Sequence, residues 1–192
     1  EARGCSIEQA TGTLVCDYQR TWFEAGLPRL DESVTLRWGT LIDPLSIVMV
    51  GLVTFVALMV QIYSLGYMRG ESRLGWYFGV HAFFAGSMLV LVLADNFLLL
   101  YAAWELVGIC SYLLIGFWHQ RPAAREAAKK AFIVTRIGDV GMLLGILLLW
   151  REVGSFSMSE IFAQVQLGSA TGGAEGLSQG VVTAAALLLY LG

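Results

Sequence analysis

Charged residues are scarce in this sequence. They make up 14% of its 192 residues, whereas hydrophobic residues make up 57%. A soluble domain carries about 25% charged residues, so this composition excludes an ordinary soluble protein. The hydrophobic residues form long runs and do not alternate with polar ones, which excludes a transmembrane β-barrel. We therefore expect an all-α, polytopic transmembrane helix bundle.

The sequence also lacks the patterns that are typical of nucleic-acid binding, metal binding, phosphate binding and nucleophilic catalysis. It has no run of basic residues with interleaved aromatics, and its formal net charge is only −3, which argues against nucleic-acid binding. It has no metal-ligand spacing, phosphate-binding loop or nucleophile constellation. We expect this chain to hold no metal and no redox cofactor.

Four hydrophobic segments are long enough to cross a bilayer, which takes about 20 residues. An acid and a proline, Asp43-Pro44, favour a helix start before the first one. The last run has about half the length of a span, and the chain begins without methionine or a signal peptide, so we expect a fragment. The predicted spans are 41–63, 76–94, 97–117 and 131–150, with the start of a further span at 181–192.

The polar segments between these spans differ in charge. Segment 1–40 has four arginines against six acids, and 151–180 has one arginine against three acids. Segment 64–75 has two arginines and one acid, and 118–130 has four basic residues and one acid. Because basic loops stay in the cytoplasm, we predict 64–75 and 118–130 inside. Segments 1–40, 94–96 and 151–180 are then outside.

Two of the outer segments, 1–40 and 151–180, carry further local signals. Cys5 and Cys16 either form a disulfide in an oxidising compartment or remain free thiols, and the sequence leaves both open. Alternation over 34–39 favours a short strand. A capping box at 157–160, followed by hydrophobic residues at helical spacing, predicts a short amphipathic helix within 151–180.

Glu105 is the single charged residue between Phe97 and Phe117 and lies close to the middle of this span. A charge at that depth costs at least ~2.5–3.5 kcal/mol on insertion scales. Glu105 is either a protonated packing residue or part of an ion pathway, and intramembrane acids favour the second. Small residues on the same helix, such as Gly108 and Ser111, leave room for another helix. A lysine or arginine approaching there would stabilise the ionised carboxylate.

Three further residues are candidates for chemistry inside the membrane. Arg136 and Asp139 are three residues apart and so share a helix face, where they form either a structural clasp or part of an ion path. His81 is either solvated or hydrogen-bonded near a helix end, or a proton relay. By contrast, Asp95 lies in a turn at the interface, where a charge costs little. Close helix packing is predicted at Gly138, Gly141 and Gly145.

Two blocks, WELVGICSYLLIGFW (104–118) and KAFIVTRIGD (130–139), are specific when taken together. Weaker supporting blocks are DPLS (43–46), GYMRGE (66–71) and VLADNFLLLY (92–101). On these blocks, from about Asp43 to Phe162, the chain resembles the largest antiporter-like subunit of respiratory complex I. This subunit is subunit L of bacterial NADH:quinone oxidoreductase, and it has a plastid counterpart.

The resemblance implies about fourteen core spans built from inverted repeats. It implies that Glu105 is the key glutamate of the fifth helix, with a lysine partner on the seventh helix beyond Gly192. Arg136 and Asp139 match the sixth-helix pair, so this chain would carry half of a proton channel. Quinone reduction elsewhere would drive pumping, with NADH, FMN, iron–sulfur clusters and quinone in partner subunits. The implied partners are other membrane subunits of complex I, and the implied location is a bacterial plasma membrane.

Two alternatives remain beside this interpretation. The first is the large subunit of a multi-subunit cation/proton antiporter, which shares the Trp-Glu helix but is disfavoured by the RIGD block. The second is a non-transporting membrane scaffold or receptor. Mid-membrane charges at Glu105, Arg136 and Asp139 argue against it, because such charges are expensive unless they serve ion movement.

Overall fold

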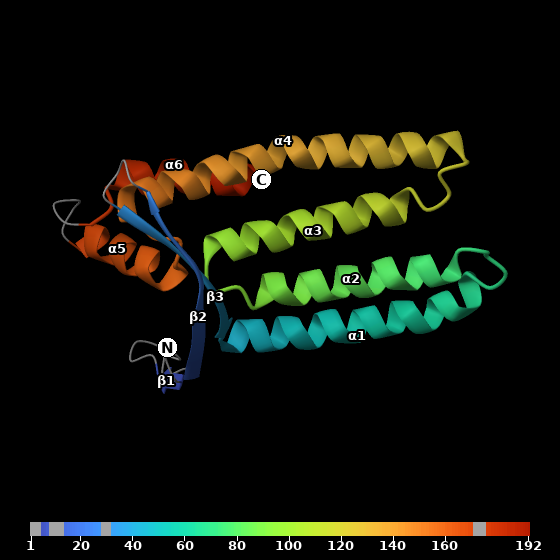
Figure 1. Cartoon of the computed structure of the whole chain (residues 1–192), viewed down its shortest axis with the longest axis horizontal. Helices are drawn as coiled ribbons and strands as arrows, with labels where there is room; N and C mark the ends of the chain where they lie inside the picture. The colour runs from blue at the N-terminus through green and yellow to red at the C-terminus, as the bar shows by residue number, and fades with distance from the viewer. Residues whose placement is uncertain (1–4, 8–13, 28–31, 171–175) are drawn as a thin grey trace.

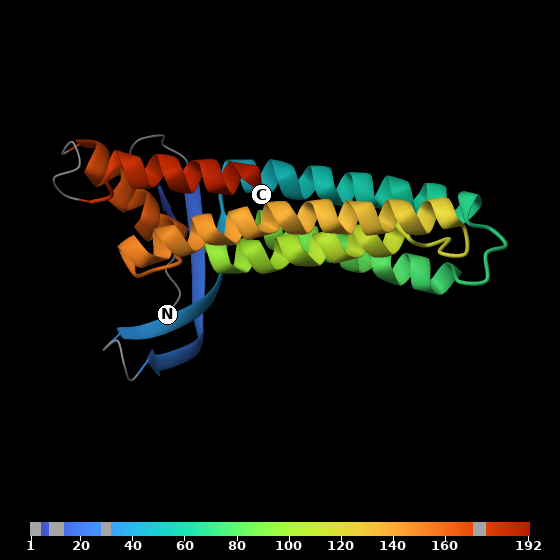
Figure 2. The ribbon, with the colours of Figure 1, turned by 90° about the horizontal axis from the view of Figure 1, so that it is seen from above.

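The computed structural model of the chain describes residues 5–7, 14–27, 32–170 and 176–192. Four long helices lie side by side, and the shorter α6 packs along α4 (Figures 1 and 2). A three-stranded antiparallel sheet and α5 lie at one end of this bundle. The helices are α1 (Pro44–Tyr67), α2 (Leu74–Val92), α3 (Phe97–Ile115), α4 (Pro122–Val153), α5 (Met158–Ala170) and α6 (Gln179–Leu191), and the strands are β1 (Cys5–Ile7), β2 (Leu14–Leu27) and β3 (Glu32–Ile42).

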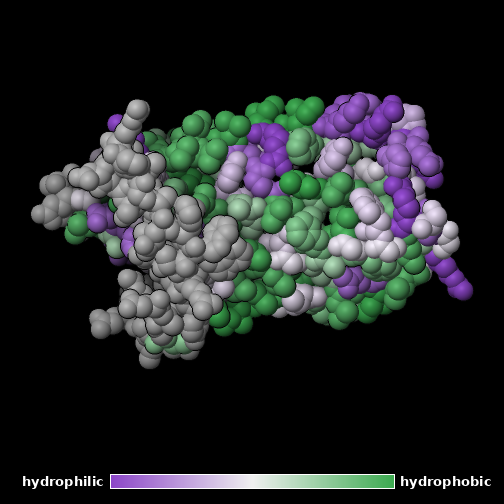
Figure 3. Space-filling model, in the orientation of Figure 1, coloured by the Kyte–Doolittle hydropathy of each residue, from purple (hydrophilic) through white to green (hydrophobic). Residues whose placement is uncertain are grey.

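The surface of the bundle is that of an integral membrane protein, as predicted. Helices α1 to α4 are each long and apolar enough to cross a membrane. On α1, Leu45, Phe55 and Leu65 are all more than 60% exposed, which water would disfavour and lipid accommodates. Figure 3 shows hydrophobic residues over the middle of the bundle and hydrophilic ones where loops join α1 to α2 and α3 to α4.

Helix α4 begins nine residues before the predicted span, so the prediction of a loop at 118–130 is wrong from Pro122 onward. Pro122 occupies the first turn, where proline is favoured, and alanine, arginine, glutamate and lysine follow it as strong helix formers. The helix ends at Gly154, whose φ of 75° is readily adopted by glycine. At about 1.5 Å per residue, α4 is longer than the hydrocarbon core of about 30 Å.

The β3–α1, α2–α3 and α4–α5 connections meet at the end of the bundle that carries the sheet. The Leu41 amide donates to the Leu93 carbonyl at 2.9 Å, and the Phe97 amide donates to the Phe156 carbonyl at 3.0 Å. Asp95 lies between them, in the predicted turn, and is only 4% exposed. Its carboxylate accepts from the Asn96 side chain at 2.7 Å.

The opposite end of the bundle carries the other two loops. The Trp118 indole donates to Glu71 at 3.1 Å, and the Arg73 guanidinium donates to the Phe117 carbonyl. The segments that the charge pattern assigned to one side of the membrane therefore share one end of the bundle.

The sheet is more extensive than the predicted strand at 34–39, which lies inside β3. Strands β2 and β3 pair antiparallel from Cys16↔Ile42 to Leu27↔Glu32. Cys5 lies directly opposite Cys16 across β1 and β2, and the two form a disulfide with their Cα atoms 4.0 Å apart. Of the two states that the sequence left open, the structure has the bridged one.

Candidate functional site

Glu105 lies one residue before the middle of α3, a helix that runs from Phe97 to Ile115. The start of this helix is fixed by Asn96, whose side chain accepts a hydrogen bond from the Leu99 amide at 2.7 Å. Such a cap satisfies one of the amides that a helix end leaves without a partner. It sets where α3 begins, and with it how deep Glu105 lies.

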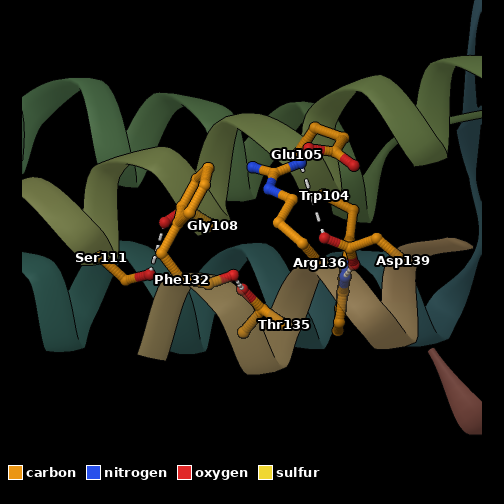
Figure 4. A network of polar contacts seen from close by, with 8 residues as sticks. All are labelled: Trp104, Glu105, Gly108, Ser111, Phe132, Thr135, Arg136 and Asp139. Atoms are coloured by element: carbon orange, nitrogen blue, oxygen red, sulfur yellow. Dashed lines mark hydrogen bonds and ion pairs between the residues drawn. The ribbon is translucent and has the colours of Figure 1, made fainter. Parts of the chain in front are cut away.

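Arg136 on α4 forms an ion pair with Glu105 across the α3–α4 interface (Figure 4). The same guanidinium lies 3.6 Å from Oδ2 of Asp139, one turn along its own helix. The side chains of Glu105, Arg136 and Asp139 are 20%, 28% and 5% exposed. The sequence predicted a basic partner for Glu105 and an Arg136–Asp139 pair separately, and the structure joins them in one cluster.

The guanidinium of Arg136 lies against Gly108 and Phe132. A Cβ atom on Gly108 would lie 3.7 Å from Nη2 of Arg136, an ordinary van der Waals distance, so a side chain larger than that of alanine would narrow the space that Arg136 occupies. The ring of Phe132 lies 4.7 Å from the centre of the guanidinium, a cation–π distance. Gly108 is one of the small residues predicted to let another helix approach Glu105.

Trp104 is a member of the cluster that sequence reasoning missed. Its indole Nε1 donates to Oδ1 of Asp139 at 3.0 Å, from the residue immediately before Glu105. A tryptophan in a hydrophobic run gives no sequence signal for this contact, because the contact depends on how α3 and α4 are rotated against each other.

The described groups of the cluster do not balance in charge. Glu105 and Asp139 carry two negative charges when ionised, and Arg136 carries one positive charge. The three groups together therefore have a formal charge of −1 when all are ionised, near the middle of α3. Removing an unbalanced charge from water is expensive.

His81 lies apart from this cluster, on α2. Its ring is parallel to that of Tyr77, with centroids 6.2 Å apart, and the residue is 8% exposed. Nε2 of His81 has no hydrogen-bond partner among the described residues. The contacts that build the cluster do not include His81, so the structure does not bring this predicted site residue to Glu105.

Comparison with known sequences supplies the family. Residues 94–192, more than half of the chain, match the family described as NADH:quinone oxidoreductase/Mrp antiporter, TM. The chain belongs to this family. Residues 30–78 also match the family described as NADH-Ubiquinone oxidoreductase (complex I), chain 5 N-terminus. The predicted relationship to antiporter-like subunits is thus confirmed.

Relatives of the chain carry consistent names. It is 46% identical over 157 residues to NAD(P)H-quinone oxidoreductase subunit 5, chloroplastic, of Anthoceros angustus, covering 82% of this chain and 21% of that protein. It is 42% identical over 172 residues to NADH-quinone oxidoreductase subunit L of Mycobacterium tuberculosis, covering 90% and 25%. The chain thus spans about a fifth to a quarter of the length of these relatives.

A solved structure confirms the fold class. The chain matches a chain in the structure of the Mrp complex from Dietzia sp. DQ12-45-1b with a TM-score of 0.72 and 30% identity. The match covers 92% of this chain and 18% of the other. The helices described above are therefore part of an antiporter-like helical bundle.

Proposed function

We propose that the chain is part of a proton-translocating membrane subunit of NADH:quinone oxidoreductase, in which Glu105 takes up and releases the proton. The observation that carries this proposal is the ion pair of Glu105 with Arg136 at the middle of α3, with Asp139 as a second carboxylate. Ionisable groups at that depth are expensive and mark ion pathways by default. The names of the relatives support the same function.

The mechanism follows from the charges of the cluster. A proton on Glu105 neutralises this carboxylate and weakens its attraction for Arg136, which then remains beside Asp139. Loss of the proton restores the ion pair. Quinone reduction elsewhere in the complex supplies the energy that shifts charges around Glu105. The family resemblance implies a lysine on another helix that pairs with Glu105 in the same way, and His81 is a further candidate relay.

Partner subunits hold the redox chemistry in this proposal. NADH, FMN, iron–sulfur clusters and quinone bind there, and this chain contacts other membrane subunits and lipid. Its location is a bacterial plasma membrane with the sheet outside. The basic residues at the opposite end of the bundle, in the α1–α2 loop and at the start of α4, support this orientation. The Cys5–Cys16 disulfide also supports it, because disulfides persist in oxidising compartments.

The orientation is tested by labelling the two cysteines after reduction with a membrane-impermeant maleimide. We expect intact cells to be labelled at Cys5 and Cys16, because both precede α1 and lie at the sheet end. A Cys5→Ser/Cys16→Ser variant is the matched control for labelling elsewhere. Labelling confined to inside-out vesicles would reverse the assignment.

The function is tested by Glu105→Gln in the complete complex, because glutamine keeps the size of the side chain but cannot ionise. We expect proton translocation to fall to the level of vesicles without substrate, while uncoupled NADH:quinone turnover continues. The two rates are measured with a pH-sensitive dye and by NADH oxidation. Glu71→Gln, in the α1–α2 loop, is the control. Undiminished pumping in Glu105→Gln at unchanged turnover would rule the function out.

A second function is the large subunit of a multi-subunit cation/proton antiporter. The similarity to the Mrp complex structure favours it specifically. Purification of the tagged subunit from its native membrane separates the two functions. Recovery with an NADH-oxidising quinone reductase supports the first, and recovery with cation/proton antiport but no NADH oxidation supports the second.

A further inference from the structure

The two carboxylates of the cluster are held differently. Asp139 has a side chain only 5% exposed and both oxygens engaged, Oδ1 by the Trp104 indole at 3.0 Å and Oδ2 by Arg136 at 3.6 Å. Glu105 is 20% exposed, and its described partner is Arg136. Figure 4 shows the carboxylate of Asp139 between Arg136 and Trp104. Asp139 is therefore the more firmly positioned of the two.

The chemistry of the indole group limits what Asp139 can do. An indole Nε1–H only donates, so the oxygen that it contacts must act as an acceptor. A proton on Oδ1 would compete with this hydrogen bond, and a proton on Oδ2 would face the positive charge of Arg136. The contact with Trp104 thus keeps Asp139 oriented as an acceptor for the guanidinium.

The guanidinium of Arg136 has room to rotate between Glu105 and Asp139. Its Nε is buried without a hydrogen-bond partner among the described residues, so that side of the guanidinium is not locked in place. Gly108 presents no side chain to Nη2. Because Arg136 already lies beside both carboxylates, a small rotation transfers it from one to the other.

We propose that Trp104 is a positioning residue that holds Asp139 as the second acceptor for Arg136, so that Arg136 can release Glu105 when Glu105 takes up a proton. This inference rests on the proposed function of Glu105. When the proton binds Glu105, the formal charge of the three groups changes from −1 to 0, and no other proton moves. Trp104 acts through Asp139 and does not itself carry the proton.

The test replaces the indole N–H without changing the shape of the ring. In the complete complex, Trp104 is replaced by benzothienylalanine, which has sulfur in place of the N–H group, and separately by phenylalanine. We expect both variants to pump several-fold fewer protons per NADH. The midpoint of the pH profile of pumping should shift by about one pH unit, because loss of a hydrogen bond to a charged group changes an equilibrium by about tenfold or more.

Trp76→Phe is the matched control, because Trp76 and Trp104 are both 40% exposed and Trp76 packs on Phe117. Pumping lost in Trp104→Phe but retained by the benzothienylalanine variant would reduce Trp104 to a packing role and overturn the inference. An unchanged pH profile of pumping in the benzothienylalanine variant would also overturn the inference. Normal pumping by Glu105→Gln would instead overturn the proposed function of Glu105. Failure of the Trp104 inference and failure of the proposed function therefore give different results.

Discussion

Helix α4 packs against two neighbours by two different kinds of contact. Towards α3 it presents Arg136 and Asp139, which form an ion pair and a hydrogen bond across the interface. Towards α6 it presents glycines, and a Cβ atom on Gly145 would lie 3.1 Å from the Ala185 carbonyl oxygen. The two interfaces of one helix therefore separate polar contact from close backbone approach.

The difference between the α3–α4 and α4–α6 interfaces shows that close packing in the bundle does not require charged residues. In lipid, helices associate through close packing of small residues or through polar contacts. Glycines achieve this without burying a charge. The α3–α4 interface instead buries groups whose desolvation is expensive, although apolar residues would fill the same space. In the proposed function, the charged face of α4 serves ion movement, whereas the glycine face serves packing against α6.

Among the variants that test the two interfaces, Arg136→Met, on the charged face of α4, is expected to have the largest effect on stability and pumping. Methionine keeps much of the length of the side chain but leaves Glu105 and Asp139 without their shared partner. Breaking a buried ion pair by removing one member costs about 3–5 kcal/mol. We expect a lower thermal unfolding midpoint of the detergent-solubilised complex, measured by scanning fluorimetry, together with loss of pumping.

Two further variants sharpen this prediction. Thr135→Val is adjacent, and its hydroxyl donates to the Phe132 carbonyl of its own helix at 2.9 Å, so we expect no measurable change. Adding Glu105→Gln and Asp139→Asn to Arg136→Met removes the uncompensated charges and should restore most of the stability but not the pumping. If Arg136→Met unfolds at the same temperature as Thr135→Val, the ion pair does not hold α3 to α4.

The candidate site could be predicted residue by residue but not as a cluster. Glu105, Arg136 and Asp139 stand out because a charge in a hydrophobic run is expensive. Spacing along one helix paired Arg136 with Asp139, yet spacing says nothing about contacts between helices. The Trp104–Asp139 hydrogen bond and the Arg136–Glu105 ion pair depend on the rotation of α3 against α4, which tertiary packing decides.

The sequence predicted the helices correctly where hydrophobicity and helix propensity agree. It did not predict the start of α4, where the two signals differ. The four spans follow from long apolar runs. At the start of α4 the hydropathy falls at Lys130, but helix-forming residues continue back to Pro122, so the helix is longer than the hydrophobic run. Asp95 is polar and sits in a turn, but three connections converge there and bury it.

A smaller effect is expected on the glycine face, from Gly145→Ala. The added Cβ would meet the Ala185 carbonyl oxygen and Leu188 Cβ at 3.1 Å, so α6 must move away by a few tenths of an ångström. Overpacking of this kind costs about 1–3 kcal/mol, partly offset by the roughly 0.5–1 kcal/mol that alanine gains over glycine in a helix. The same thermal measurement should show a modest decrease, with proton translocation per NADH preserved.

Gly51→Ala on α1 is the matched control, since nothing lies within 4 Å of the position that its Cβ would take. This variant gains the helix propensity without the clash, so its unfolding temperature should equal or exceed that of the parent. The contrast between the two alanines isolates the α4–α6 contact from propensity. Equal unfolding temperatures would mean that α6 yields freely, whereas loss of pumping in Gly145→Ala at normal stability would mean that the glycine face also takes part in ion movement.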